Sequence, residues 1–333
     1  MNTDLILDSP AVAGQPTGRT ALGYALVISA VTMWSLNASL ARFLLDDGLS
    51  AMRLSELRSV GAFVILVAIL LAVRPQDIRV RREHVPQLAF LGIAGLAAVY
   101  VTYFVAIDRL QIGVALTLEY LAPLFILLWL TVVHGRRLSL GLWAAVALSL
   151  AGCVLVVRAY DPGSLDLLGI VAGVGAGISY AIYLAGGERA GRRHPPHTTL
   201  VWAFGFATLF WICIQPPWSF PFDQLDTAED AMLALAVVVV GTLLPFGLMV
   251  AALRHVPAAR AAAVATLEPA LSAIFAFAIH DESLAAVQIA GILIVLAAVA
   301  WVQTQRPDIA AESVGPELSS ARGAEPLSPR AAR

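Results

Sequence analysis

The 333-residue sequence contains no lysine, and all 21 of its basic residues are arginine. A Walker A loop needs a lysine to reach the phosphates of a bound nucleotide, so the chain has no such ATP site. Charged residues make up only 13% of the sequence, whereas soluble domains carry about 25%. The mean hydropathy of +0.81 therefore indicates a membrane protein, and the net charge of −2 argues against a nucleic-acid partner.

Cysteine is scarce as well. Cys153 and Cys213 both lie in apolar runs, so we predict two small buried side chains and no disulfide framework. The six histidines lack metal-ligand spacing, and neither an HExxH nor a GxSxG motif is present. These absences predict no cofactor and no metal, and they argue against an enzyme.

Long apolar runs dominate what the sequence does contain. A membrane-spanning helix needs about 20 apolar residues, and ten runs approach or exceed that length. They cover residues 21–41, 54–73, 87–107, 112–133, 139–158, 166–186, 198–215, 230–253, 258–279 and 285–303. We predict an all-α integral membrane protein with ten transmembrane helices. Residues 1–20 precede the first, retained span, and residues 304–333 have nothing to bury and are expected to be a disordered tail.

The arginines indicate how the spans are oriented. With a cytoplasmic N-terminus, sixteen arginines fall in segments on the inner side and four on the outer side, while Arg58 lies within a span. Cytoplasmic loops of membrane proteins carry the excess of basic residues. We therefore predict that both termini are cytoplasmic.

The chain contains an internal repeat. A shift of 146 positions superimposes Pro123 on Pro269, Trp34 on Tyr180, and the span positions of residues 21–158 on those of 166–303. Each half has five spans, so the second half must enter the membrane upside down relative to the first. Inverted repeats of this kind are typical of secondary transporters that bind their substrate near the midplane.

Three ionisable residues interrupt the apolar spans: Glu119, Glu268 and Arg58. A charge at the bilayer centre costs about 2.5–3.5 kcal/mol even on the gentlest scales. The two glutamates lie at similar depths of the repeat-related fourth and ninth spans, about one helical turn apart. They are candidates for a proton or substrate site, and the alternative is that each only holds two helices together. Arg58 is either a counter-ion to a glutamate or to a substrate carboxylate, or it extends to the outer interface.

Pro123 and Pro269 follow these glutamates and remove one backbone hydrogen bond each, which predicts helix breaks at corresponding positions of the two halves. Packing kinks are the simpler alternative.

A set of polar and aromatic side chains recurs at spacings of three residues. These side chains either line the site or anchor the helices at the membrane–water interface. The set consists of Trp34, Asn37, Tyr100, Tyr103, Tyr180 and Tyr183, with Tyr120 beside Glu119.

Gly169, Gly173 and Gly177 form a GxxxGxxxG pattern in the sixth span. Small residues at this spacing let two membrane helices approach closely. We predict a helix-packing surface there, with a hinge as the alternative.

The membrane region resembles the drug/metabolite transporter superfamily of EamA type, and within it the threonine/homoserine exporter branch. Three blocks carry the resemblance: GVALTLEYLAPL at 113–124, GAGISYAIYLAGGERAG at 175–191, and TLLPFGLMVAALRHVPAARAAAVATLEPAL at 242–271. Many EamA-type proteins have Glu before Arg after the fourth span, whereas Arg136 takes that place here, as in the exporter branch. The resemblance implies two five-helix repeats, proton-driven export of small metabolites, and a site at Glu119 and Glu268.

Together these patterns predict an inner-membrane exporter of small polar metabolites, with amino acids such as threonine or homoserine as substrate, a proton as coupling ion and the lipid bilayer as surroundings. Efflux of drug-like cations or of secondary metabolites is the alternative within transporters. A membrane enzyme or receptor is the alternative from another class. The oligomeric state is left open.

Overall fold

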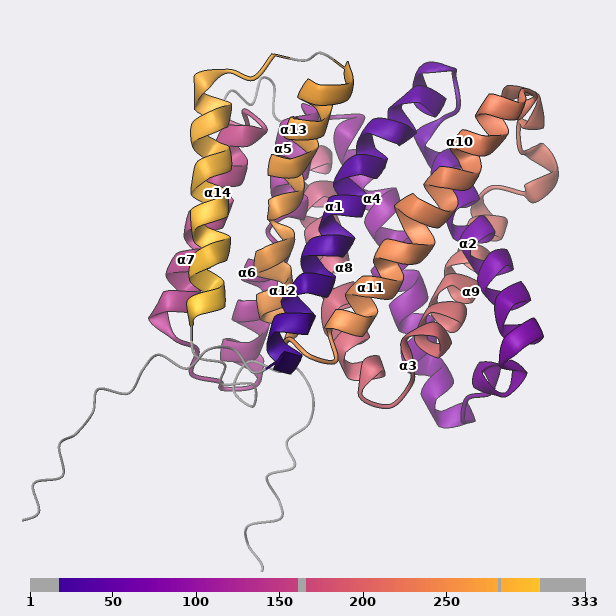
Figure 1. Cartoon of the computed structure of the whole chain (residues 1–333), viewed down its shortest axis with the longest axis horizontal. Helices are drawn as coiled ribbons and strands as arrows, with labels where there is room; N and C mark the ends of the chain where they lie inside the picture. Colours follow the sequence, from indigo (N-terminus) through magenta and orange to yellow (C-terminus); the bar gives the residue numbers. More distant parts are fainter. Residues whose placement is uncertain (1–17, 161–165, 281–282, 306–333) are drawn as a thin grey trace, which may run out of the picture.

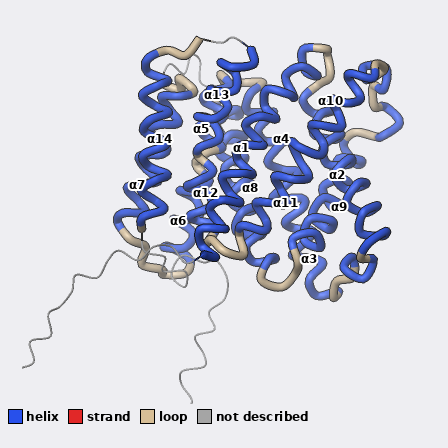
Figure 2. Tube along the Cα trace, viewed as in Figure 1, coloured by secondary structure: helices blue, strands red, loops and turns tan. Residues whose placement is uncertain are grey.

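The computed structural model describes residues 18–160, 166–280 and 283–305, and every regular element in these ranges is a helix (Figure 2). Nine of its helical segments are long and apolar enough to cross a membrane, and Leu140–Val156 is a shorter apolar helix of 17 residues. At 1.5 Å per residue, 17 residues span about 26 Å, close to the thickness of a hydrocarbon core. The predicted all-α membrane fold with ten spans is confirmed.

The first half forms five spans, three of them continuous and two divided. In chain order they are α1 (Gly18–Asp46), α2 (Ala51–Val73), α3–η3–α4 (Val85–Phe90, Leu91–Ala97, Ala98–Ile107), α5–α6–η4 (Ile112–Glu119, Ala122–Leu128, Trp129–Val133) and α7 (Leu140–Val156). The second half repeats this order. Its spans are α8 (Leu167–Gly191), α9 (Pro196–Ile214), α10–η7–α11 (Ala228–Val238, Val239–Leu243, Leu244–Ala252), α12–α13 (Ala258–Ala265, Leu267–His280) and α14 (Ala286–Thr304).

Polar N-caps start several of these helices at the ends of the spans. Ser50, Ser139, Asp166 and Thr227 each accept a backbone N–H from three residues further on, at the beginnings of α2, α7, α8 and α10. A side-chain oxygen at this position satisfies one of the donors that a helix leaves unpaired at its start. The apolar interiors of the spans then continue as helix because every other backbone group must be bonded within the segment.

The packing of the spans follows a pseudo-twofold symmetry between the halves. Helix α1 packs against α11 and α13, and its repeat partner α8 packs against α4 and α5. The pairs α2–α9 and α7–α14 join repeat-related spans directly, at opposite sides of the molecule in Figure 1. Spans three and eight both contain a π-helical segment, η3 and η7, at equivalent depths. Two inverted five-helix repeats account for this arrangement.

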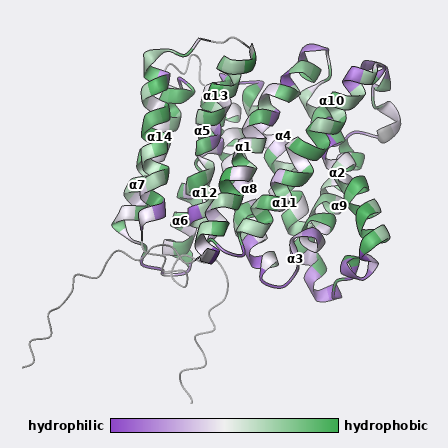
Figure 3. Cartoon of the chain, in the orientation of Figure 1, coloured by the Kyte–Doolittle hydropathy of each residue, from purple (hydrophilic) through white to green (hydrophobic). Residues whose placement is uncertain are grey.

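Helix α1 begins and α14 ends at the same face of the molecule, the lower edge of Figure 1, which we call the terminal face; the opposite face is the distal face. Hydrophobic colour covers the middle of the helices in Figure 3, and hydrophilic residues gather at both faces. Large apolar side chains such as Val64 and Leu293 are exposed along this middle zone, as expected for contact with lipid.

The structure corrects one prediction about the cysteines. Cys153 is buried, but Cys213 is exposed near the end of α9. An apolar run does not distinguish the lipid-facing from the protein-facing side of a helix, since both sides are hydrophobic. Helix α1 begins at Gly18, three residues before the predicted boundary. The remaining prediction for residues 1–17 and that for the tail from 306 onwards lie outside the described residues.

Candidate functional site

The fourth and ninth spans are both interrupted near the middle of the bundle. Helix α5 ends at Glu119 and α6 resumes at Ala122; α12 ends at Ala265 and α13 resumes at Leu267. Pro123 and Pro269 lie in the first turns of α6 and α13, where a missing backbone N–H breaks no helical bond. As a result Glu119 is the last residue of α5, and Glu268 lies in the first turn of α13.

Other spans supply partners for the backbone at the break in span nine. The carbonyl of Thr266 accepts a weak hydrogen bond from the Cys153 thiol of α7 at 3.6 Å. The carbonyl of Glu268 accepts one from Ser35 Oγ of α1 at 3.1 Å. Backbone groups inside a membrane must be paired, so these contacts allow the helix to break at this depth.

The two glutamates lie close enough for their carboxylates to interact electrostatically. Both side chains are half-buried, in contrast to the fully buried alanines of α12 around the break. Four tyrosines surround the pair, each within electrostatic range of both carboxylates: Tyr100, Tyr103, Tyr120 and Tyr180. The Tyr120 hydroxyl hydrogen-bonds to Glu268, and Arg58 is near enough to Glu268 for charge–charge attraction. Tertiary structure thus brings together residues from spans two, three, four, six and nine.

Trp34, Asn37, Tyr180 and Tyr183 form a second group on the repeat-related helices α1 and α8. All four are at least 92% buried, so their side chains pack inside the protein and do not face the surrounding lipid or water. Phe246 of α11 joins them, with its ring centroid 5.0 Å from that of Trp34 and 5.2 Å from that of Tyr183. Within the described residues, four polar atoms of this group have no hydrogen-bonding partner: Trp34 Nε1, Asn37 Oδ1, Tyr180 OH and Tyr183 OH. Buried polar atoms are normally paired, so these four atoms are available to hydrogen-bond a polar ligand.

Arg58 of α2 lies inside the bundle and contacts span eight. Its Nε donates to Thr242 Oγ1 at 2.8 Å and its Nη2 to the Gly241 carbonyl at 3.1 Å. The guanidinium carbon is 5.0 Å from the centroid of the Tyr100 ring. These contacts direct the charge towards the tyrosines and Glu268 rather than to the distal face.

The glycine pattern of α8 packs against the break in span four. A Cβ atom at Gly173 would lie 2.6 Å from Leu118 Cδ1, and one at Gly177 would lie 2.6 Å from the Leu118 carbonyl oxygen. Neither position has room for a side chain. The predicted packing surface is therefore present, and it holds α8 directly against the end of α5.

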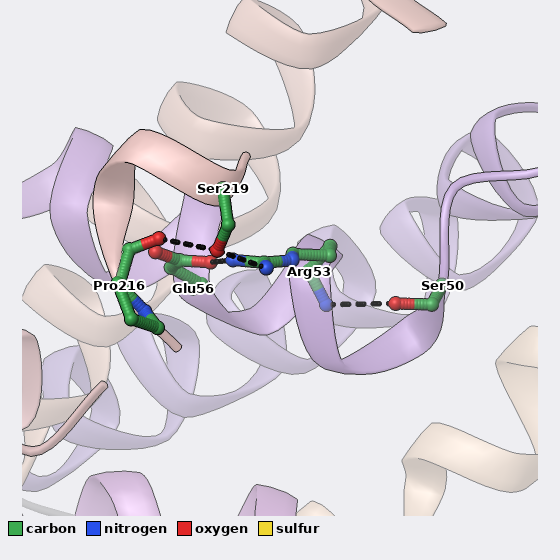
Figure 4. Close-up of polar contacts among 5 residues, drawn as sticks. All are labelled: Ser50, Arg53, Glu56, Pro216 and Ser219. Carbon is green, nitrogen blue, oxygen red and sulfur yellow. Dashed lines mark hydrogen bonds and ion pairs between the residues drawn. The ribbon is translucent and has the colours of Figure 1, made fainter. Parts of the chain in front are cut away.

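A buried ion pair at the distal face was absent from the sequence-based predictions. Glu56 is 2% exposed, and Arg53 one turn earlier donates to its Oε2 at 2.7 Å (Figure 4). Arg53 also donates to Ser219 Oγ at 2.7 Å, and Ser219 donates to the Pro216 carbonyl (Figure 4). The start of α2 is thereby tied to the loop between α9 and α10. An acid and an arginine three residues apart were the available signal.

The terminal face contains another buried charge that the sequence did not reveal. Glu188 of α8 is 2% exposed, accepts a hydrogen bond from the backbone N–H of Ala258 at 2.8 Å, and pairs with Arg192. Its carboxylate thus caps the start of α12. Arg260, also buried, donates to the carbonyls of Val302 and Gln305 at the end of α14. These contacts close the terminal face around spans six, nine and ten.

A groove of about 380 Å³ lies elsewhere, between α1, α2, α9 and α11. Its lining is almost entirely apolar, with Met33, Leu66, Leu200 and Leu248 among the contributing residues. It contains none of the ionisable residues discussed above.

Comparison with known proteins gives a consistent result. The model of the EamA-like transporter family matches the chain twice, at residues 21–158 and 167–304. The threonine/homoserine exporter RhtA of Escherichia coli K12 is 29% identical over 285 residues, covering 82% of this chain and 89% of that protein. The pseudopaline exporter CntI of Pseudomonas aeruginosa is 27% identical over 243 residues, covering 72% and 82%. A crystal structure with 17% identity superimposes with a TM-score of 0.70 over 84% of this chain and 96% of the other, so the two share a fold.

Proposed function

Because the chain belongs to the EamA-like transporter family, we propose that it exports small polar metabolites, in particular amino acids such as threonine and homoserine, in exchange for protons. One observation carries this proposal: Glu119 and Glu268 lie at the interruptions of two repeat-related spans, within electrostatic range of each other. Interrupted helices in corresponding positions of inverted repeats are typical of transport sites. The names of the similar exporters from E. coli and P. aeruginosa support the direction of transport.

The helix ends favour different roles for the two carboxylates. Glu268 lies in the first turn of α13, where the positive end of the helix dipole stabilises an ionised carboxylate. Glu119 ends α5, where the negative end of the dipole opposes ionisation. We therefore assign binding and release of the proton to Glu119, and pairing with the ammonium group of the substrate to Glu268. The buried polar atoms of Trp34, Tyr180 and Tyr183 supply hydrogen bonds to the same cargo.

The chain is oriented with both termini in the cytoplasm of a bacterial cell and lies in the inner membrane. The excess of arginine on the side of the termini supports this orientation. The position of the start of α1 and the end of α14 at one face agrees with it (Figure 1). The contacts of Glu188 and Arg260 then close the cytoplasmic side, and the pair of Arg53 and Glu56 lies on the periplasmic side.

Efflux from preloaded cells tests the proposal. We expect cells that express the chain to release threonine or homoserine faster than empty-vector cells, with a rate that depends on external pH. Glu119→Gln should abolish the pH dependence, and Glu268→Gln should abolish binding of the substrate. Unchanged pH-dependent efflux in both variants would rule out the coupling role. Resistance to cationic dyes but not to amino-acid analogues would instead favour the efflux of drug-like cations.

A further inference from the structure

The guanidinium of Arg58 is held along one edge by the π-helical segment of span eight. Thr242 Oγ1 accepts from Arg58 Nε and itself donates to the Val237 carbonyl at 3.0 Å, five residues earlier. The Gly241 carbonyl accepts from Nη2. A guanidinium has five N–H donors in a rigid plane, so span eight leaves three of them unbound, including both on Nη1, and Tyr100 is a further hydrogen-bonding neighbour. The donors that remain form the fork that binds carboxylates in a bidentate manner.

Tyr100 is the other direct neighbour of the guanidinium, and it carries no charge that would neutralise the arginine. Arg58 forms no ion pair within 4.0 Å of a carboxylate in the described part of the chain, and Glu268 attracts it only from a greater distance. The guanidinium carbon lies 5.0 Å from the centroid of the Tyr100 ring, within the range of a cation–π interaction. A bound carboxylate would therefore meet an oriented cation whose direct partners in the described residues, Thr242, Gly241 and Tyr100, are all neutral.

The repeat shows that this cation is specific to one half. A shift of 146 positions places Arg58 on Phe204, Thr242 on Leu96 and Tyr100 on Phe246. The Phe204 and Phe246 rings pack at 5.5 Å, much as Arg58 lies against Tyr100, but Phe204 and Leu96 are apolar and 2% exposed. The glutamates, in contrast, occur in both halves. The two halves therefore share their acids but differ in the cation.

We propose that Arg58, positioned by Thr242, recognises the carboxylate of the substrate, so that the site takes a zwitterion with its ammonium group at Glu268. This inference rests on the proposed export function and narrows its substrate class to amino acids. A site that served only cations would gain nothing from an arginine within electrostatic range of its acids, because the arginine would repel the cargo. Thr242 acts as a positioning residue for Arg58.

Binding to the purified full-length protein in nanodiscs tests the assignment. The probes are the twenty standard amino acids with homoserine, and two analogues of threonine: threoninol, which lacks the carboxylate, and N-acetylthreonine, which lacks the ammonium group. We expect the parent to bind threonine or another amino acid more tightly than either analogue. Arg58→Gln should weaken binding of that amino acid about 10- to 100-fold, as loss of a charge-assisted hydrogen bond implies. Binding of threoninol should stay unchanged or become tighter, because a charge that repels its ammonium group is removed.

Matched variants separate recognition from folding. Thr242→Val should weaken amino-acid binding with little effect on threoninol, and Thr242→Ser, which keeps the hydroxyl, should restore it. Arg109→Gln removes a half-exposed arginine at the distal face and should change neither affinity. If Arg58→Gln does not fold, Arg58→Lys provides the same comparison with the charge retained and the planar fork lost.

Two results would overturn the inference. Equal loss of threonine and threoninol binding in Arg58→Gln would mean that the arginine only ties α2 to span eight. Unchanged binding of amino acids would mean that it does not touch the substrate. If the parent binds threoninol but no amino acid, the proposed substrate class fails together with this inference. If the parent binds amino acids and only the arginine variants behave otherwise than expected, the proposed function stands without this inference.

Discussion

Replacement of Arg53 by glutamine would leave the Glu56 carboxylate without its counter-ion inside the protein. The Glu56 side chain is 3% exposed and that of Arg53 is 17% exposed, so the two partners are not equivalent. Without Arg53, Glu56 has little access to water that could compensate for the lost pair. Without Glu56, Arg53 keeps its hydrogen bond to Ser219 and part of its hydration.

The expected cost follows from this asymmetry. Removal of one partner of a buried ion pair typically costs about 3–5 kcal/mol, because an uncompensated charge is left behind. We expect about 3 kcal/mol for Arg53→Gln, at the lower end because the site lies near the distal face. For Glu56→Gln we expect about 1 kcal/mol, the size of a single hydrogen bond. The double variant should be less destabilised than Arg53→Gln alone, since it contains no buried carboxylate without a counter-ion.

The free energy of unfolding of the purified protein in mixed micelles, titrated with denaturing detergent, measures all three variants against the parent. A coupling energy of about 2 kcal/mol between the two positions is expected from the double-mutant cycle. Additive effects within about 0.5 kcal/mol, or a larger loss for Glu56→Gln than for Arg53→Gln, would refute the reasoning. Ser219→Ala serves as a control for the loop contact alone.

Three further outcomes can be checked by thermal unfolding in detergent. Gly177→Ala should destabilise the protein by about 1–3 kcal/mol, because its Cβ would meet a backbone carbonyl of α5, whereas Gly175→Ala, whose nearest new contact is 3.4 Å, should have little effect. Burial, together with the neighbouring His84 and Arg193, lowers the pKa of His194 at the terminal face below its usual 6.5. The unfolded chain then takes up the proton first, so stability should fall as the pH drops through 6.5, and His194→Asn should flatten that pH profile. Glu188→Gln should cost about 1–2 kcal/mol through the weaker cap of α12, and Glu188→Ala should cost more because it leaves the cap unfilled.

The sequence determined the fold because few kinds of secondary structure can cross a membrane. Runs of apolar residues near 20 in length can cross the bilayer only as helices, so the ten spans were predictable within a few residues of their observed ends. The odd number of spans in each repeat required the halves to be inverted. The positions of Glu119 and Glu268 also followed from sequence, since a carboxylate within an apolar run is conspicuous.

The contacts between spans could not be predicted from the sequence in the same way. Hydropathy does not tell a lipid-facing from a protein-facing side, which is why the exposed Cys213 was predicted as buried. Glu188 and Glu56 lie near the ends of spans, where a sequence reading assigns charges to water; only packing against α12 and the pair with Arg53 buries them. The π-helical segment of span eight arises from a local change in hydrogen bonding without a clear sequence signal.

Sequence by itself therefore determined how many times the chain crosses the membrane, the inverted repeat, and which rare charges the spans contain, because each of these follows from the cost of exposing polar groups to lipid. Only the tertiary structure decided what those charges face. It turned Arg58 towards Thr242 and Tyr100, brought two interrupted helices together, and buried the polar atoms of α1 and α8 without partners. The physical reason is that helix rotation and contact depend on packing between spans that are more than a hundred residues apart in the chain.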